Sequence, residues 1–214
     1  SFYIDGPVLE IENSSFIGLH PVPIVYGMTI GEYGKMINGE GWLENKTKAN
    51  LEVIRIKNYN HNLRYEPPVR PSPNLPNLQS IYLYPSLAFL EKTEVSVGRG
   101  TKIQFQIYGH PNFISDFSFT PMPNFGSQYP KLNGKLSFGE DLRNYKTKDK
   151  IELKWLIKSY NQISDKTKFF RSDFDKLSGT SNLKKQIIEG ESESLIRESW
   201  KDGLEKFKKI REKY

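Results

Sequence analysis

The part of the sequence that restricts the fold most is the stretch 69–101, which reads VRPSPNLPNLQSIYLYPSLAFLEKTEVSVGRGT. Prolines alternate with polar residues over 70–74. Because proline fixes φ at about −65° and favours extended geometry in the residue before it, this segment is predicted to be stiff and non-helical. The stretch ends in the turn Gly98-Arg99-Gly100-Thr101, whose glycines permit positive φ and close backbone approach.

Both ends of this stretch carry side chains suited to ligand binding. Arg70 and Asn74 belong to the proline-rich segment, and Arg99 stands between two glycines. A rigid segment loses little conformational entropy when a ligand binds, which favours binding at such positions. The two polar segments, joined by the apolar run 81–90, are typical of a pocket wall for an anionic or polar ligand. Their chemistry does not indicate a particular reaction.

The composition limits the class of protein. A chain of 214 residues forms one large domain, or a domain and a half, with a sizeable core. Its net charge of +6 is modest and spread along the sequence, so solvated helix faces explain it better than a nucleic-acid interface does. Cysteine is absent, which excludes disulfides and thiolate metal sites. No window reaches the apolar length of a membrane span.

The first residues read like the interior of a domain. SFYIDGP lacks an initiator methionine and a signal peptide, so we expect a mature or truncated N-terminus. Asp5, before Gly6-Pro7, is expected to form a turn, with a carboxylate ligand as the less favoured alternative. His20 lies in a loop rich in Pro and Gly. A structural hydrogen bond is favoured there over a role as a base, and a place in a site stays open.

The clearest helix start lies between two extended regions. Thr29-Ile30-Gly31-Glu32 matches the capping box, so a helix is predicted from Thr29 to Gly39, with Glu32 as a cap rather than a catalytic carboxylate. The polar segment 41–50 is the best candidate for an internal boundary.

The middle of the chain carries several strand signals. Residues 51–57, LEVIRIK, read as a strand, and the alternation over 102–108 indicates a half-buried strand. Short strands are expected at 117–120 and 136–138. The run 80–90 fits either a buried strand or a short helix, because periodicity cannot decide for runs of this length.

The last third is predicted to be helical. Asp149 to Glu152 gives a second capping-box pattern. Three apolar stripes at helical spacing are expected to face the core: Leu153, Leu156, Ile157 and Tyr160; Leu183, Ile187 and Ile188, closed by Gly190; Ile196, Trp200, Leu204, Phe207 and Ile210. Strands followed by helices predict an α/β or α+β layer fold.

Familiar catalytic patterns are missing from the sequence. His20, His61 and His110 do not have zinc-site spacing. There is no G-x-S-x-G elbow, Walker loop or G-x-G-x-x-G fingerprint. A pair of glycosidase carboxylates cannot be chosen from 25 acidic residues without a fold.

Several motifs in a fixed order nevertheless resemble one family. They are IDGPVLE at 4–10, SSFIGLHPVPIVYGMTIGE at 14–32, RPSPNLP at 70–76, YPSLAFLE at 84–91 and VGRGT at 97–101. The chain resembles the NamZ family of exo-β-N-acetylmuramidases, glycoside hydrolase family 171, over essentially its whole length. Tyr26 departs from the family pattern, since a histidine commonly precedes Gly-Met-Thr there. A tyrosine keeps a hydrogen bond at that position but does not titrate near neutral pH.

The resemblance implies an organisation and an activity. It implies that 1–49 are the end and linker of a Rossmann-like N-terminal domain, and that 50–214 form a smaller mixed α/β C-terminal domain with terminal helices. Members remove terminal N-acetylmuramic acid from the non-reducing end of peptidoglycan fragments, as part of bacterial cell-wall turnover. The catalytic glutamate is then expected upstream of Ser1, so these residues alone are expected to be inactive. A periplasmic or secreted location is expected, without a cofactor or a metal.

The resemblance and the residues agree on the arginines. N-acetylmuramic acid carries a lactyl carboxylate, which a guanidinium binds with two hydrogen bonds. Arg99 is the first candidate for that role and Arg70 the second, while Asn74 and Tyr84 are candidates for the acetamido group or ring hydroxyls. The alternatives are an ion pair of Arg99 with a buried carboxylate across the domain interface, a turn cap for Asn74 and plain packing for Tyr84. His20 and Tyr26 complete the candidate set.

Two other functions compete with a muramidase. One is a non-catalytic module that binds peptidoglycan or another carbohydrate, which would need no catalytic segment. The other, weaker one is a basic nucleic-acid binder, suggested only by the pI of about 9.2. The partners expected from the preferred function are muramyl sugars, peptidoglycan fragments and the missing N-terminal domain.

Overall fold

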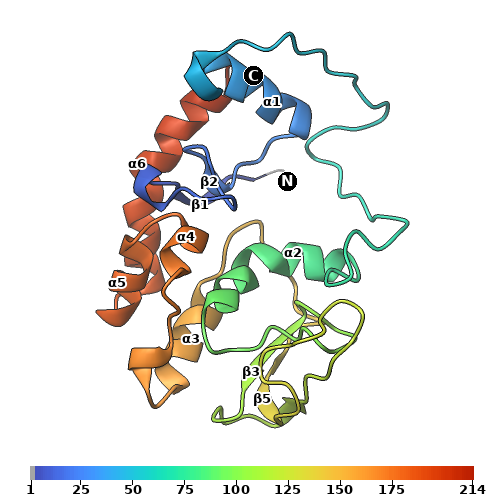
Figure 1. Cartoon of the computed structure of the whole chain (residues 1–214), viewed down its shortest axis with the longest axis vertical. Coiled ribbons are helices and arrows are strands. Elements are labelled where there is room, and N and C mark those ends of the chain that lie inside the picture. Colours follow the sequence, from blue (N-terminus) through green and yellow to red (C-terminus); the bar gives the residue numbers. More distant parts are fainter. Residues whose placement is uncertain (1–2) are drawn as a thin grey trace.

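A small antiparallel sheet and one helix form the first part of the chain in the computed structural model, which describes residues 3–214 (Figure 1). β1 (Asp5–Val8) pairs with β2 (Pro23–Val25), and α1 (Ile30–Gly39) follows. The predicted capping box is confirmed. The Glu32 amide donates to Thr29 Oγ1 at 3.2 Å, and the Thr29 amide donates to Glu32 Oε2 at 2.8 Å.

A long connection without strands separates α1 from the next helix. The strand predicted over 51–57 is wrong, since these residues form neither a strand nor a helix. Leu51, Ile54 and Ile56 are 43%, 88% and 74% exposed, because no neighbouring strand of the described residues pairs with them. Figure 1 shows the connection passing along the side of the molecule opposite α6 (Glu193–Arg211).

The ambiguous run after the proline-rich segment is helical. α2 (Leu78–Leu87) starts with a capping box between Asn77 and Ser80 and continues into a 3₁₀ turn at Ala88–Lys92. Its buried face consists of Ser80, Leu83, Ser86 and Leu87. Because two of these are serines, the helical spacing of the buried face cannot be recognised from hydrophobicity alone.

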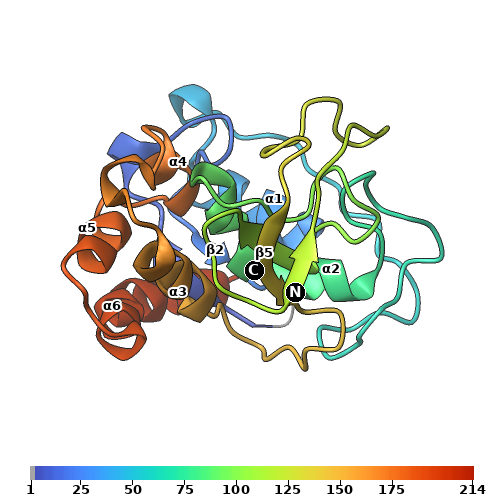
Figure 2. The same cartoon turned by 90° about the horizontal axis from the view of Figure 1, so that it is seen from below.

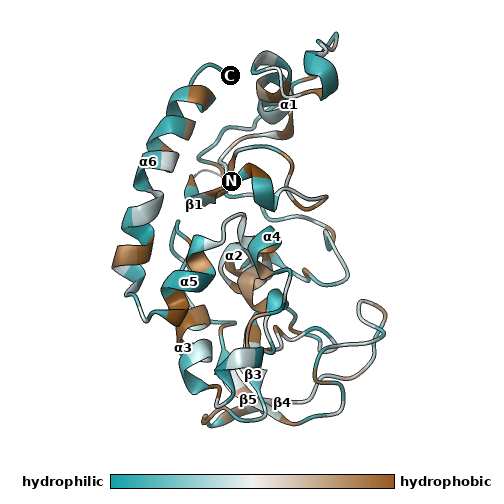
Figure 3. Ribbon diagram, turned by 60° about the vertical axis from the view of Figure 1, so that its left-hand side comes forward, coloured by the Kyte–Doolittle hydropathy of each residue, from teal (hydrophilic) through white to brown (hydrophobic). Residues whose placement is uncertain are grey.

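A second sheet has three antiparallel strands in the order β3-β5-β4. Figure 2 labels β5, and Figure 3 labels all of its strands at one end of the molecule. These are β3 (Ile107–His110), β4 (Phe117–Phe119) and β5 (Ser137–Asp141), so the short strands predicted near 117–120 and 136–138 are confirmed. The strand predicted over 102–108 is wrong before Ile107. Phe105 has a φ of 53°, which turns the chain and buries Gln104 and Gln106 on the side expected to face water.

The rest of the described chain holds the α-helices α3 (Lys154–Gln162), α4 (Phe174–Ser178), α5 (Asn182–Ile188) and α6, with a 3₁₀ turn at Lys166–Lys168. The predicted apolar stripes face the core, except that Ile188 is 52% exposed. The second capping box is wrong. Helix α3 begins at Lys154, and the Glu152 amide donates to Ser86 Oγ instead. Figure 3 shows α6 as a largely hydrophilic helix along one side of the molecule, with its hydrophobic residues in separate patches.

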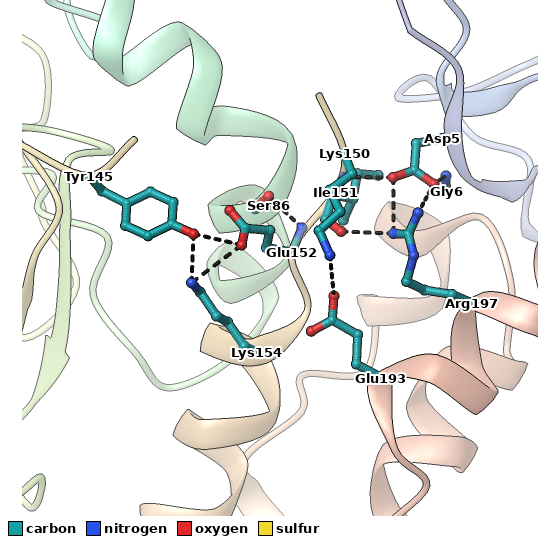
Figure 4. A network of polar contacts seen from close by, with 10 residues as sticks. All are labelled: Asp5, Gly6, Ser86, Tyr145, Lys150, Ile151, Glu152, Lys154, Glu193 and Arg197. Atoms are coloured by element: carbon teal, nitrogen blue, oxygen red, sulfur yellow. Dashed lines mark hydrogen bonds and ion pairs between the residues drawn. The ribbon is translucent and has the colours of Figure 1, made fainter. Parts of the chain in front are cut away.

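Asp5 ties the first strand to the last helix. It is 2% exposed, and its carboxylate accepts two hydrogen bonds from Arg197 of α6, at 2.9 and 3.0 Å (Figure 4). The amides of Gly6 and Ile151 donate to the same carboxylate at 2.9 and 2.6 Å. Asp5 is therefore a buried structural ion-pair partner, and the prediction of a simple turn-former is corrected.

The elements pack around one main core and one smaller cluster. Residues of α2, β3, α3, α5 and α6 contribute to the main core, while Met28, Met36 and Phe207 form the smaller cluster between α1 and α6. The mixed α/β fold class with terminal helices is confirmed. Within residues 3–214, no helix has the length and apolar character needed to cross a membrane.

Candidate functional site

A pocket of about 340 Å³ lies where the β1–β2 region meets α1, α2 and the end of α4. The loop between β1 and β2, the side chain of Tyr33 on α1 and that of Tyr84 on α2 contribute to its wall. Residues 176–179 close another side. Most of the lining residues are apolar, and the polar ones are His20, Tyr26, Tyr33, Tyr84, Lys176 and Ser178. An apolar pocket with a few polar groups is the usual form of a small-molecule site.

A cluster of rings forms the polar part of this pocket. His20 Nδ1 and the Tyr33 hydroxyl share a hydrogen bond of 2.8 Å. The His20 ring stacks on Trp42 with centroids 5.6 Å apart, and Tyr26 stacks on Tyr33 at 4.9 Å. Burial lowers the pKa of His20, so the ring is neutral at neutral pH. Burial raises the pKa of Tyr33, which keeps its hydroxyl protonated.

Arg99 is not among the residues that line this pocket. Its Nε and Nη2 donate to the two carboxylate oxygens of Glu91 at 2.7 and 2.6 Å, and these hydrogen bonds raise the pKa of Arg99. Its guanidinium lies 5.1 Å from the centre of the Phe105 ring, which also contacts Tyr84. Since an arginine has five N–H donors and two are used here, three remain for another partner.

Arg70 and Asn74 belong to the proline-rich segment and lie outside this pocket. Arg70 is exposed and donates to Gln104 Oε1 at 3.5 Å. Asn74 Nδ2 donates to the Gly126 carbonyl at 2.7 Å, while its Oδ1 is enclosed without a hydrogen-bond partner. The Asn74 contact fixes the proline-rich segment against the loop that contains Gly126, and the Arg70 contact joins it to Gln104.

The structure brings His20, Tyr26 and Tyr84 together in one pocket, and it places Arg70, Asn74 and Arg99 outside that pocket. Their roles toward a ligand stay predictions. Tyr33 and Trp42 had not been predicted from the sequence as residues of a site. The spacing of Tyr33 from its N-cap was the available signal, because it sets which side of α1 the ring occupies.

The charged groups of the described chain do not assemble a metal centre. Within residues 3–214, no three or more His, Asp or Glu side chains are arranged to hold an ion. The pocket therefore offers hydrogen bonds, ring faces and apolar walls, with Lys176 as its charged lining residue.

Comparison with known proteins identifies relatives over the whole chain. The C-terminal model of the exo-β-N-acetylmuramidase NamZ family matches residues 82–214, and the N-terminal model matches 1–79. The models meet near residue 80, whereas the sequence analysis placed a domain boundary at 49/50. The peptidoglycan β-N-acetylmuramidase NamZ of Bacillus subtilis (strain 168) is 33% identical over 236 residues, covering 99% of this chain and 55% of that protein. The chain thus spans about half the length of this curated relative.

Two solved structures share the fold. A DUF1343 family protein from Bacteroides fragilis NCTC 9343 is 43% identical with a TM-score of 0.96, covering 100% of this chain and 62% of that one. A second protein of that family and organism is 20% identical with a TM-score of 0.78, covering 99% and 62%, and indicates the fold alone. Together with the matching family models, these findings show that the chain belongs to the NamZ exo-β-N-acetylmuramidase family.

Proposed function

We propose that this chain is the C-terminal part of a peptidoglycan-processing exo-β-N-acetylmuramidase, which hydrolyses terminal N-acetylmuramic acid from the non-reducing end of its substrate. One observation carries the proposal. In a member of this family, His20, Tyr26, Tyr33 and Tyr84 line one pocket whose remaining lining is mostly apolar.

The chemistry of the pocket suits an N-acetylated sugar. Aromatic rings offer flat apolar surface together with a polar tip, which matches a sugar ring with its C–H faces and hydroxyls. The volume of about 340 Å³ lies at the lower end of the roughly 300–1,000 Å³ common for ligand sites. The neutral His20–Tyr33 pair can exchange hydrogen bonds with a hydroxyl or an acetamido group without a change of charge.

The lactyl carboxylate requires a cation near the sugar. We assign this role first to Arg99, because its guanidinium keeps three unused N–H donors beside Tyr84, a residue of the pocket wall. Arg70 is the second candidate, and its exposure leaves it accessible. Asn74, which shares the proline-rich segment with Arg70, is proposed to contact the acetamido group or a ring hydroxyl.

Catalysis is assigned to a carboxylate outside these residues. The proposal is supported by the share of the relatives that the chain covers, 55% and 62%. It is also supported by the segment 51–57, whose apolar side chains are exposed in this chain. These side chains would be buried if the backbone of the segment paired as a strand with the sheet of a Rossmann-like N-terminal half. A periplasmic or secreted location follows for an enzyme that acts on peptidoglycan.

The test compares this chain with a longer protein that includes the upstream half. The longer protein is expected to release the chromophore from a muramyl glycoside, and the 214 residues are expected not to. Binding of N-acetylmuramic acid without turnover by either protein would instead favour a carbohydrate-binding module. Fractionation of cells that produce the full protein tests the location.

A further inference from the structure

The ammonium group of Lys131 lies inside a cage of backbone carbonyls. Its Nζ donates to the carbonyl oxygens of Leu90 and Glu91 at 3.1 Å each, of Thr93 at 2.6 Å and of Val95 at 2.9 Å. All four acceptors belong to the segment 90–95, which leaves the 3₁₀ turn after α2. The residue keeps partial surface exposure, whereas its charged end is enclosed by these oxygens.

The number of acceptors favours the charged form. A neutral amine has two N–H bonds and a lone pair that would repel a carbonyl oxygen, whereas an ammonium has three N–H bonds and a positive charge. Burial lowers the pKa of Lys131 to about 7, and the four carbonyl dipoles oppose this because each stabilises the cation. Rings of backbone carbonyls are also the environment that replaces the hydration shell of K⁺ in proteins.

The loop that carries Lys131 contacts both segments that hold candidate ligand-binding residues. The Met122 amide donates to the Gly100 carbonyl at 2.9 Å, and Asn124 Nδ2 donates to the Thr101 carbonyl at 3.1 Å. The same loop accepts the hydrogen bond from Asn74 at Gly126. The segment 121–134 thus touches the turn that holds Arg99 and the segment that holds Asn74.

The packing at Gly100 shows how closely the loop approaches. Gly100 has a φ of +83°, and a Cβ added there would lie 2.7 Å from both the Met122 carbonyl oxygen and Pro130 Cβ. Pro130 is the direct neighbour of Lys131 in the chain. The ammonium cage and the glycine contact therefore involve the adjacent loop residues Lys131 and Pro130.

We propose that Lys131 is a positioning residue whose ammonium acts as an internal cation, pinning the loop 121–134 to the segment 90–95 and thereby setting the places of the Glu91–Arg99 pair and Asn74. The attachment of the loop through Lys131 is inferred from the contacts alone, whereas the contact of these side chains with a sugar rests on the proposed function.

The first experiment measures amide hydrogen exchange in Lys131→Met, with Lys135→Met as the matched control at an exposed lysine of the same region. Loss of a charged hydrogen-bonding group that holds several acceptors should raise exchange at 98–101 and 121–134 by about ten-fold or more. Lys135→Met should leave exchange there as in the original chain. Equal exchange in the two variants would overturn the pin.

The second experiment asks whether a cation is what the cage requires. Lys131→Ala leaves the carbonyls without their donor, so KCl or NH₄Cl should restore thermal stability and slow exchange, whereas LiCl at the same concentration should not. A variant that is unfolded in LiCl and folded in KCl gives the same support. The same response to all three chlorides, including none, would contradict an internal cation.

A binding measurement separates the pin from the proposed function. If the original chain binds N-acetylmuramic acid, Lys131→Met should weaken that affinity by about ten-fold, with Lys135→Met unchanged. Unchanged affinity in a variant with fast exchange would overturn the positioning role. If the original chain binds no muramyl sugar, the proposed function fails, and the exchange and chloride experiments still decide the pin.

Discussion

Glu91 and Arg99 form a two-point ion pair within one short stretch of the chain, with N–O distances of 2.7 and 2.6 Å. The side chains are only 26% and 32% exposed. The alternative expected from the sequence was an ion pair of Arg99 across a domain interface. The partner instead lies at the end of the 3₁₀ turn after α2, so the guanidinium is held in place before any ligand arrives.

We predict that Arg99→Lys weakens binding of N-acetylmuramic acid by about 1–3 kcal/mol, because lysine lacks the planar fork that matches a carboxylate. Isothermal calorimetry on the folded variant measures this. N-acetylglucosamine, which has no lactyl carboxylate, is the control ligand, and its affinity should not change. A loss of affinity equal for both sugars would show that Arg99 supports the pocket without meeting the carboxylate.

Asp5→Asn is expected to destabilise the chain by about 3 kcal/mol, since it leaves Arg197 without a counter-charge in a largely buried place. Urea unfolding measures the change. Lys201→Met removes an exposed ion pair with Glu198 and should cost less than about 1 kcal/mol. The double variant Asp5→Asn/Arg197→Met should recover part of the stability lost in Asp5→Asn. A small effect of Asp5→Asn alone would contradict the role given to the buried pair.

The stability contributed by His20 should depend on pH. Burial lowers its folded-state pKa below the usual value of about 6.5, so the unfolded chain binds the proton more tightly. This contribution is fully present above about pH 6.5 and is lost as the pH falls towards the folded-state pKa. The unfolding free energy of the original chain should therefore drop between pH 7.5 and 5 by more than that of His20→Asn.

Tyr33→Phe is the control for this experiment, because it removes the hydrogen bond to His20 but keeps the ring. It should retain the pH dependence of the original chain. Equal slopes for the original chain and His20→Asn would show that the imidazole does not titrate differently on folding.

Ile54→Asp tests the proposed contact with an N-terminal half. Ile54 is 88% exposed in this chain, so the substitution should change its stability by less than about 0.5 kcal/mol. In the longer protein the same change would place a carboxylate in a buried sheet, and thermal unfolding should begin at a clearly lower temperature. Lys57→Asp, at the last position of the same segment, is the control for added negative charge. Equal effects of Ile54→Asp in both proteins would remove the segment from the interface.

The sequence alone determined features set by neighbouring residues. The start of α1 followed from Thr29 and Glu32, whose side chains satisfy amides within the same turn. The apolar stripe of α6 was readable because its spacing matches one helix face. The order of several family motifs likewise sufficed for the resemblance that the comparisons then confirmed.

The tertiary structure decided what depends on residues far apart in the chain. A strand exists only where another strand accepts its hydrogen bonds, so 51–57 had the right pattern without forming one. Asp5 and Arg197 are separated by 192 positions, and the pocket that holds His20, Tyr26 and Tyr84 is closed by the distant residues 176–179. Local sequence records the propensity of a segment, whereas the partner of a buried charge or a pocket wall is fixed only when the chain has folded.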